Sequence, residues 1–148
     1  MTSVLFVCTG NTCRSPIAES LLKYMNIPEV EVKSAGIFAI DGSEASTNTK
    51  IVLDEHGIPH NHKSAMLTDE LVEWADFILT MTMGHKSTVL TMFPNAQDKT
   101  FTLKEFAKID GYQDVADPYG GPVDVYRYSF KEIKEAIENI ADILKENT

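Results

Sequence analysis

The chain has 148 residues, of which 43% are apolar and 24% charged, a composition typical of a soluble globular domain. Its formal net charge of -9 argues against an extended surface for nucleic acid or anionic membrane, because such surfaces bind through many Lys and Arg side chains. No apolar run approaches the roughly 20 residues that span a bilayer, and the first residues do not resemble a signal peptide. We expect one cytoplasmic, monomeric domain over residues 1–148, with no nucleic-acid or membrane partner.

Strand and helix patterns alternate along the first part of the chain. The apolar run at 3–7 predicts a strand, and residues 15–25 follow it with apolar side chains at helical spacing. An alternating pattern at 29–37 predicts a second strand, and residues 43–58 predict a helix that ends near Gly57. The chain therefore begins with two consecutive strand and helix units.

The same alternation continues through the second half. The elements expected there are a short helix at 67–75 that begins near Thr68, a buried strand at 76–81, a helix at 84–93 stopped by Pro94, and a short strand at 99–103. Residues 111–128 contain too much Gly, Pro and Asp for regular structure. The final segment, 123–147, carries the apolar stripe of a packing helix, formed by Ile133, Ile137, Ile140 and either Ile143 or Leu144. Strands that alternate with helices predict an α/β domain with a doubly wound parallel sheet.

The loop after the first predicted strand, in the stretch VLFVCTGNTCRSP from Val4 to Pro16, holds the candidate site. Ligands bind beyond the carboxyl ends of the strands in such sheets, where loop N–H groups and a helix N-terminus attract anions. The loop is neither a nucleotide P-loop nor a dinucleotide fingerprint. Cys8 is instead a candidate nucleophile, because the helix dipole and Arg14 favour its thiolate, and the Arg14 fork can hold two oxygens of an oxyanion. An inert buried thiol and a surface arginine are the alternative, but this combined spacing seldom arises by chance.

The chain contains only two cysteines, Cys8 and Cys13, and four scattered histidines, which do not form the ligand pairs of a zinc site. We therefore expect no metal. Two thiols in one short loop suggest reversible pairing under oxidation, in which Cys13 captures a sulfenic acid formed on Cys8. The alternative is that Cys13 is a small buried filler.

The segment CTGNTCRSPIAE resembles the signature of the low-molecular-weight protein phosphatases, C-x5-R-[ST] directly after the first strand. DPYGG resembles that family's general-acid loop, and the similarity extends through SAGIF, ADFILTM and the final helix. The resemblance implies a four-stranded parallel sheet flanked by helices and a reaction without a cofactor. It also implies that Cys8 attacks phosphorus to form a phosphocysteine, and that Asp117 protonates the leaving group and then activates water. Phosphoryl oxygens would be bound by Thr9, Gly10, Asn11, Thr12, Cys13, Arg14 and Ser15.

Physical chemistry supports this division of roles. A thiolate is a good nucleophile at neutral pH, but a departing nitrogen or oxygen leaves poorly without a proton. Burial by a neighbouring loop and the charge of the phosphoryl group would help Asp117 to hold that proton. The alternative is a turn-forming Asp-Pro. By resemblance, hydrogen bonds that support the loop come from Asn11, Ser15, Ser34 and His62. For His62, an ordinary structural histidine is an equal alternative.

The substrate class depends on positions where the chain departs from the phosphotyrosine-specific members. They typically have a bulky aliphatic residue in place of Thr12 and a second aromatic in place of Gly120. Phosphotyrosine requires apolar walls, whereas phosphoarginine carries a polar guanidinium with several N–H donors. The chain carries both CTGNTCRS and DPYGG, and in this combination it resembles the bacterial protein-arginine phosphatases. We therefore favour phosphoarginine in proteins as the substrate, with phosphotyrosine as the alternative. The expected pocket walls are Thr12, Ile37, Phe38 and Tyr119.

Two further hypotheses belong to other classes. Arsenate reductases of this fold need an additional downstream cysteine pair, which the chain lacks. A catalytically inactive phosphate-binding module would have no need for a nucleophile, an arginine and an acid together.

Overall fold

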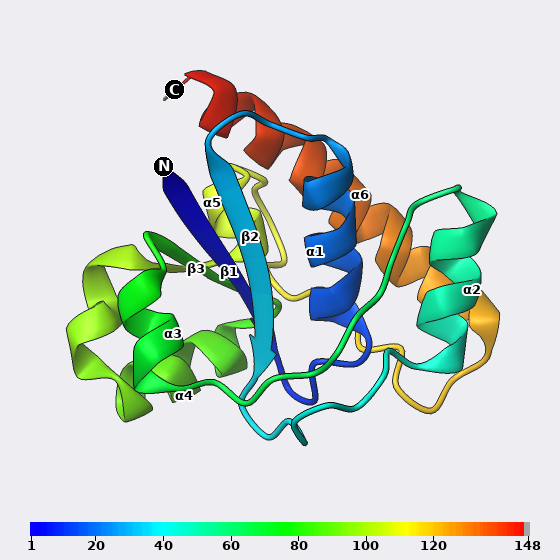
Figure 1. Ribbon diagram of the computed structural model, residues 1–148, viewed down its shortest axis with the longest axis horizontal. Helices are drawn as coiled ribbons and strands as arrows, with labels where there is room; N and C mark the ends of the chain where they lie inside the picture. Colours follow the sequence, from blue (N-terminus) through cyan, green and yellow to red (C-terminus); the bar gives the residue numbers. More distant parts are fainter. Residues whose placement is uncertain (147–148) are drawn as a thin grey trace.

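The computed structural model describes residues 1–146 and contains a four-stranded parallel sheet with the strand order β2-β1-β3-β4 (Figure 1). The strands are β1 (Thr2–Cys8), β2 (Val30–Gly36), β3 (Phe77–Thr80) and β4 (Thr100–Thr102). The chain runs from β1 to β2 on one side and then crosses back to β3 on the other side of β1. The reversal brings the loops after β1 and β3 together at the carboxyl edge, the usual ligand site of such a sheet.

Helices cover both faces of this sheet. The helices are α1 (Arg14–Tyr24), α2 (Thr47–Glu55), α3 (Asp69–Trp74), α4 (Met83–Met92), α5 (Leu103–Phe106) and α6 (Val123–Glu146), and the 3-10 helix η1 spans Pro94–Lys99. Figure 1 shows α1, α2 and α6 on one side of the strands and α3 and α4 on the other. The predicted doubly wound, four-stranded parallel sheet is therefore confirmed.

Alternating side chains of β1 explain why the sheet has two apolar faces. Val4 and Phe6 point into the core shared with α1 and α6, whereas Leu5 and Val7 point into the core shared with α3 and α4. All four side chains are completely buried. A strand buried on both faces reads as a continuous apolar run, and this is the pattern that predicted β1 from the sequence.

The predicted helix boundaries hold in most places and fail in two. The helix predicted over 43–58 begins only at Thr47, because Ser46 caps it by accepting the N–H of Thr49 at 3.3 Å. The segment 111–128 is irregular only as far as residue 122, since α6 begins at Val123. In the final helix the buried stripe uses Leu144, and residue 147 of the prediction lies outside the described residues.

Two short elements were not predicted, namely η1 after α4 and the single turn α5 after β4. Thr102 forms a capping box with Glu105 that starts α5. Within residues 1–146, no helix combines the length and apolar character required to span a membrane.

Candidate active site

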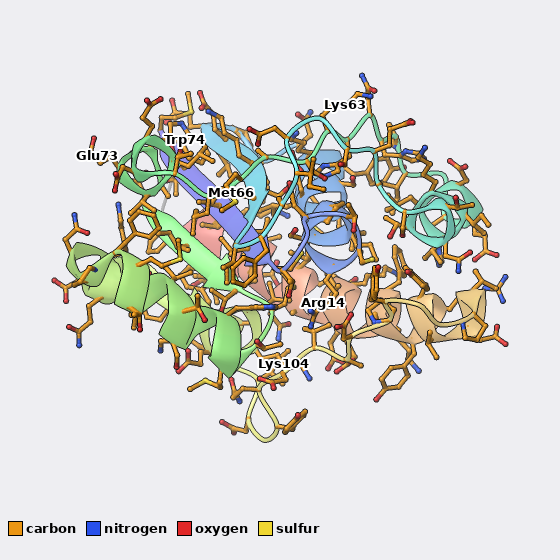
Figure 2. The ribbon with its side chains drawn as sticks, turned by 90° about the horizontal axis from the view of Figure 1, so that it is seen from below. Arg14, Lys63, Met66, Glu73, Trp74 and Lys104 are labelled. Atoms are coloured by element: carbon orange, nitrogen blue, oxygen red, sulfur yellow. The ribbon has the colours of Figure 1, made fainter. Side chains whose placement is uncertain are left out.

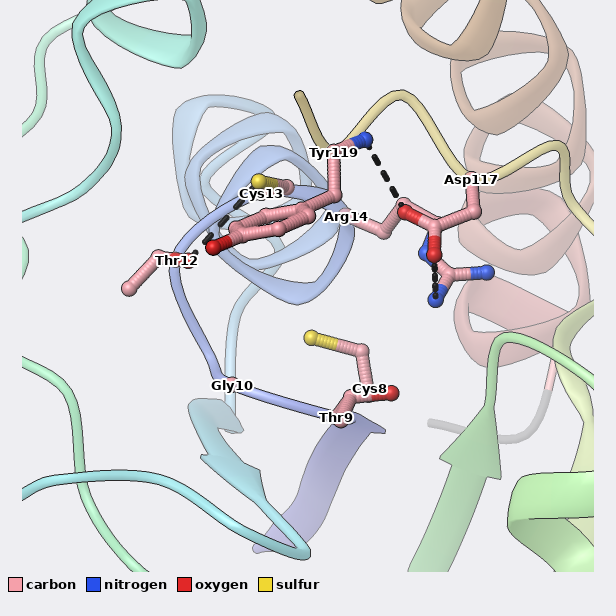
Figure 3. Close-up of a pocket in the computed structure, with 8 residues that line it drawn as sticks. All are labelled: Cys8, Thr9, Gly10, Thr12, Cys13, Arg14, Asp117 and Tyr119. Carbon is pink, nitrogen blue, oxygen red and sulfur yellow. Dashed lines mark hydrogen bonds and ion pairs between the residues drawn. The ribbon is translucent and has the colours of Figure 1, made fainter. Parts of the chain in front are cut away.

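A pocket of about 290 Å³ lies at the carboxyl end of β1, between the loop after that strand and the loop before α6 (Figure 3). All eight lining residues were predicted as site residues, namely Cys8, Thr9, Gly10, Thr12, Cys13, Arg14, Asp117 and Tyr119. Residues more than 100 positions apart are therefore brought to one cavity. The sequence predicted a site at this edge of the sheet, and the pocket lies at the same edge.

Arg14 connects the two loops of the pocket. Its guanidinium is almost completely buried, and Nη1 donates a hydrogen bond to the carbonyl of Val115 at 3.0 Å. Nη2 lies 3.7 Å from Oδ2 of Asp117. Because one side of the guanidinium is held by a backbone carbonyl, its direction is fixed before any anion binds, and the remaining N–H groups are available to phosphoryl oxygens.

Asp117 differs from expectation in its surroundings. Its side chain is 59% exposed, so the predicted burial by a neighbouring loop is wrong. Its Oδ1 accepts the N–H of Tyr119 at 3.0 Å, a local turn that orients the carboxylate toward Arg14 (Figure 3).

A chain of hydrogen bonds leads from the Cys8 thiol into the core. Its Sγ lies 2.9 Å from Oγ of Ser15, which accepts the amide N–H of Asn11 at 2.7 Å. The same amide donates to Oγ of Ser34 at 2.9 Å. Since the Ser15 oxygen already accepts from Asn11, its own O–H is free to donate to the Cys8 sulfur.

Glu19 is the far end of this chain and was missed in the sequence. Its carboxylate accepts from Ser34 Oγ, lies 3.3 Å from Nδ1 of His62, and pairs with Lys23 at 2.6 Å. Burial raises the pKa of Glu19, but hydrogen bonds from His62, Lys23 and Ser34 outweigh burial and lower that pKa to about 2. Glu19 follows Ser15 by four residues, so helical spacing was the signal that would have placed both on one face of α1.

His62 and Ser64 hold the backbone at the tip of the loop. His62 Nε2 donates to the Asn11 carbonyl at 2.6 Å, and Ser64 Oγ donates to the same carbonyl at 2.8 Å. Asn11 has a φ of 57°, in the left-handed region, and its side-chain Oδ1 accepts the N–H of Ala65 at 2.9 Å. These contacts stabilise a conformation that most side chains avoid. Asn11, Ser15, Ser34 and His62 all make hydrogen bonds around the loop, and their role in supporting it stays a prediction.

Gly36, the last residue of β2, allows the loop to approach the sheet closely. A Cβ at this position would lie 2.6 Å from the carbonyl oxygen of Thr9 and 2.9 Å from the N–H nitrogen of Asn11. Both are backbone atoms, which cannot rotate away as a flexible side chain does. Glycine is therefore required here because there is no room for a Cβ atom, and not because the backbone has a positive φ.

His85, on the first turn of α4, was also missed. Its Nε2 lies 2.8 Å from Oγ1 of Thr9, and its buried Nδ1 has no hydrogen-bond partner among residues 1–146. We assign the ring hydrogen to Nε2, because a hydrogen on Nδ1 would be a buried donor without an acceptor. Burial and the neighbouring charge of Arg14 lower the pKa of His85 to about 4. The position directly after β3 was the available signal, since that edge also carries the site.

Cys13 contacts three hydroxyl groups. Its Sγ lies 3.5 Å from the hydroxyl of Tyr126 and 3.7 Å from the hydroxyls of Ser46 and Thr12. Both Cys8 and Cys13 are free thiols in the structure. Burial and the contact with Cys13 raise the pKa of Tyr126 to about 12.

The predicted specificity residues divide into two groups. Thr12 and Tyr119 line the pocket, and Figure 3 shows the Tyr119 ring extending toward Thr12. The prediction that Ile37 is a pocket wall is wrong. Ile37 is 2% exposed and packs in the core between the sheet and helices α3 and α4. Phe38 is not among the lining residues. Its side chain is 74% exposed, and its N–H donates to the Thr9 carbonyl at 2.9 Å.

Two residues predicted to bind phosphate, Asn11 and Ser15, lie behind the loop and are completely buried. Their side chains support the pocket without lining it. Within residues 1–146, no three His, Cys, Asp or Glu side chains gather in an arrangement that could hold a metal ion.

Comparison with known proteins identifies the family. The model of the family described as low molecular weight phosphotyrosine protein phosphatase matches residues 3–148. The chain belongs to this family. A protein-arginine-phosphatase from Geobacillus stearothermophilus is 52% identical over 143 residues, which are 96% of this chain and 95% of that protein.

Solved structures of this phosphatase family have the same fold. The YwlE arginine phosphatase from Geobacillus stearothermophilus superposes with a TM-score of 0.95 at 51% identity, over 99% of this chain and 95% of that one. A YwlE arginine phosphatase variant with a phosphorylated active-site serine has a TM-score of 0.93 at 42% identity, over 99% of this chain and 97% of that one.

Proposed function

We propose that this protein is a protein-arginine phosphatase that hydrolyses phosphoarginine in proteins through a phosphocysteine intermediate. The observation that carries the proposal is the pocket itself, in which Cys8, Arg14 and Asp117 line one cavity beside the polar wall of Thr12. The 52% identity to a protein-arginine-phosphatase over nearly the whole length of both chains supports the same substrate class.

In the first step the Cys8 thiolate attacks phosphorus, a P–S bond forms, and the bond from phosphorus to the guanidinium nitrogen breaks. Arg14 and the loop N–H groups bind the phosphoryl oxygens, on which negative charge is concentrated. Asp117 donates its proton to the departing nitrogen, so that the product leaves as a neutral or cationic guanidine group. The Ser15 hydroxyl, 2.9 Å from the sulfur, stabilises the thiolate before the attack.

In the second step water attacks the phosphocysteine, and the P–S bond breaks. Asp117, now a carboxylate, accepts a proton from the attacking water, and the electron pair of the P–S bond returns to Cys8 as a thiolate. Inorganic phosphate is then released, and Asp117 is protonated again for the next cycle. This reaction requires no cofactor. A solved relative with a phosphorylated active-site serine supports the covalent intermediate proposed for Cys8.

The substrate class follows from the chemistry of the pocket wall. A phosphorylated guanidinium presents several N–H donors in a plane, and the hydroxyl of Thr12 is an acceptor on the wall of the cavity. The Tyr119 ring supplies an aromatic face on which a planar guanidinium can stack. The same ring also suits the phenyl group of phosphotyrosine, which is therefore the competing substrate.

The test is a comparison of kcat/KM on phosphoarginine and phosphotyrosine peptides of equal sequence, with Cys8→Ser as the inactive control. We expect the phosphoarginine peptide to be hydrolysed with the higher kcat/KM, and Cys8→Ser to abolish turnover of both. Preference for the phosphotyrosine peptide would overturn the arginine assignment and leave a protein-tyrosine phosphatase. Undiminished phosphate release by Cys8→Ser would overturn the covalent mechanism.

A further inference from the structure

The loop that carries Asp117 is held by backbone contacts on the side that precedes this residue. The N–H of Val115 donates to the carbonyl of Met81, at the end of β3, at 2.9 Å, and its C=O accepts from Arg14. The Asp117 side chain itself is 59% exposed and contacts the Arg14 guanidinium and the N–H of Tyr119. Its position therefore depends on where the backbone of the loop is fixed.

Ala116, directly before Asp117, is bound by helix α6 at both of its polar backbone atoms. The Ala116 N–H donates to Oε1 of Glu132 at 3.2 Å, and its C=O accepts the hydroxyl of Ser129 at 2.8 Å. Ser129 and Glu132 are three residues apart, so they lie on one face of α6. The Ala116 carbonyl belongs to the peptide plane that continues into Asp117, and the Ala116 N–H belongs to the plane before it. Ser129 and Glu132 therefore fix the two consecutive peptide planes that lead to the acid.

Lys104, on α5, fixes the second oxygen of Glu132. Its Nζ lies 2.7 Å from Oε2, and the Lys104 and Glu132 side chains are only 12% and 17% exposed. In Figure 2 the labelled Lys104 lies beside the pale yellow loop that leads to α6. Low exposure reduces solvent screening, so this pair is held more firmly than a surface ion pair. Lys104 thereby leaves Oε1 directed at the Ala116 N–H.

We propose that Glu132, together with Ser129 and Lys104, positions the loop of Asp117 for proton transfer. This inference rests on the proposed role of Asp117 as general acid. Proton transfer requires the acid within about 2.6–3.2 Å of the leaving atom, and a misplacement of about 1 Å costs on the order of 100-fold in rate. None of the three residues lines the pocket, so they act through the loop as positioning residues.

The experiment compares two aryl phosphates that differ in their need for a proton. Phenolate is a poor leaving group that requires an acid, whereas 2,4-dinitrophenolate departs unassisted. Glu132→Ala and Ser129→Ala should each lower kcat/KM for phenyl phosphate by about 10-fold and leave kcat/KM for 2,4-dinitrophenyl phosphate within about twofold. Glu132→Gln keeps an acceptor for the Ala116 N–H and should recover most of the loss. Glu135→Ala, an exposed residue of the same helix, is the matched control and should change neither value.

Asp117→Asn separates this inference from the proposed function. It should show the same leaving-group pattern with a larger loss. If Asp117→Asn is slowed on phenyl phosphate while Glu132→Ala and Ser129→Ala are unaffected, or if these two variants lose activity equally on both esters, the positioning role is wrong. If Asp117→Asn hydrolyses phenyl phosphate at the unmodified rate, the general-acid role itself is wrong.

Discussion

The Ser15 hydroxyl lies 2.9 Å from the Cys8 sulfur and at the same time accepts a hydrogen bond from Asn11. This double contact turns the hydroxyl hydrogen toward the sulfur. The donor is completely buried, so water does not compete for the contact. Two buried side chains of the same segment, Ser15 and Asn11, therefore support the Cys8 sulfur.

Replacing Ser15 by Ala removes this donor and should slow the reactions of the Cys8 sulfur. A hydrogen bond to a charged group is worth about 1.5–3 kcal/mol, so alkylation of Cys8 by iodoacetate at pH 7 should slow roughly 10-fold or more. Ser20→Ala, a buried serine of the same helix, is the control and should react at the unmodified rate. An unchanged alkylation rate in Ser15→Ala would show that the hydroxyl does not stabilise the thiolate.

Glu19 should make the protein lose stability at acid pH in a defined window. Its folded-state pKa of about 2 is below its ordinary value of 4.5, so the carboxylate stabilises the fold above pH 4.5, and this contribution is lost as the pH falls toward 2. The contribution is on the order of 3 kcal/mol because each pKa unit corresponds to about 1.4 kcal/mol. Urea unfolding of Glu19→Gln between pH 5 and pH 2 should show a flatter decline than the unmodified protein. Parallel declines would contradict the assignment.

His85 titrates in a different window, which serves as a check on that experiment. Its folded-state pKa of about 4 is below the ordinary value of 6.5, so the unfolded chain binds a proton that the native protein does not. Stability should therefore fall as the pH decreases from 6.5 to 4. His85→Asn should remove this part of the loss and leave the decline below pH 4 in place.

Cys13 should form a disulfide with Cys8 only after it leaves its contact with Tyr126. The Tyr126 hydroxyl lies 3.5 Å from the Cys13 sulfur and helps to hold it in its present place. After mild peroxide treatment, we expect mass spectrometry to find a Cys8–Cys13 disulfide that dithiothreitol reverses, and to find that Tyr126→Phe forms it faster. Irreversible sulfinic acid on Cys8 with no disulfide would identify Cys13 as a packing residue.

Local spacing explains why much of the site could be predicted from the sequence. Cys8 and Arg14 are six residues apart in one strand-to-helix loop, so their proximity does not depend on the rest of the fold. Ile37 was wrongly predicted to be a pocket wall, because the prediction did not consider which face of the sheet its side chain points to. Val32 faces α1, and residues an odd number of positions away from it, such as Ala35 and Ile37, face the α3 and α4 side, away from the pocket.

Contacts between distant elements were beyond sequence reasoning. The pairing of His85 with Thr9 joins residues 76 positions apart, and Ala116 meets Glu132 only because α6 packs beside the loop. Asp117 was recognised from its motif, but its exposure was not. Motifs thus singled out the candidate reacting groups, whereas the residues that contact and support them were found only in the structure.

Thr12 should decide which phosphorylated side chain the pocket accepts. It lines the cavity, and replacing it by Ile adds apolar bulk beside the substrate while it removes a hydrogen-bonding hydroxyl. A guanidinium N–H left without its acceptor costs roughly 1–3 kcal/mol, so kcat/KM for a phosphoarginine peptide should fall about 5- to 150-fold. The ring of phosphotyrosine loses no comparable contact, and its kcat/KM should hold or rise.

The ratio of the two kcat/KM values is the informative quantity for Thr12→Ile, because a damaged loop would depress both activities together. Thr12→Ser retains the hydroxyl without the methyl group and is the matched variant, which should keep the preference for phosphoarginine. A parallel loss of both activities in Thr12→Ile would mean that Thr12 maintains the structure of the loop and does not discriminate between the two substrates. In that case the polar contacts to the guanidinium would have to come from elsewhere in the pocket, where the Asp117 carboxylate is a charged acceptor among the lining residues.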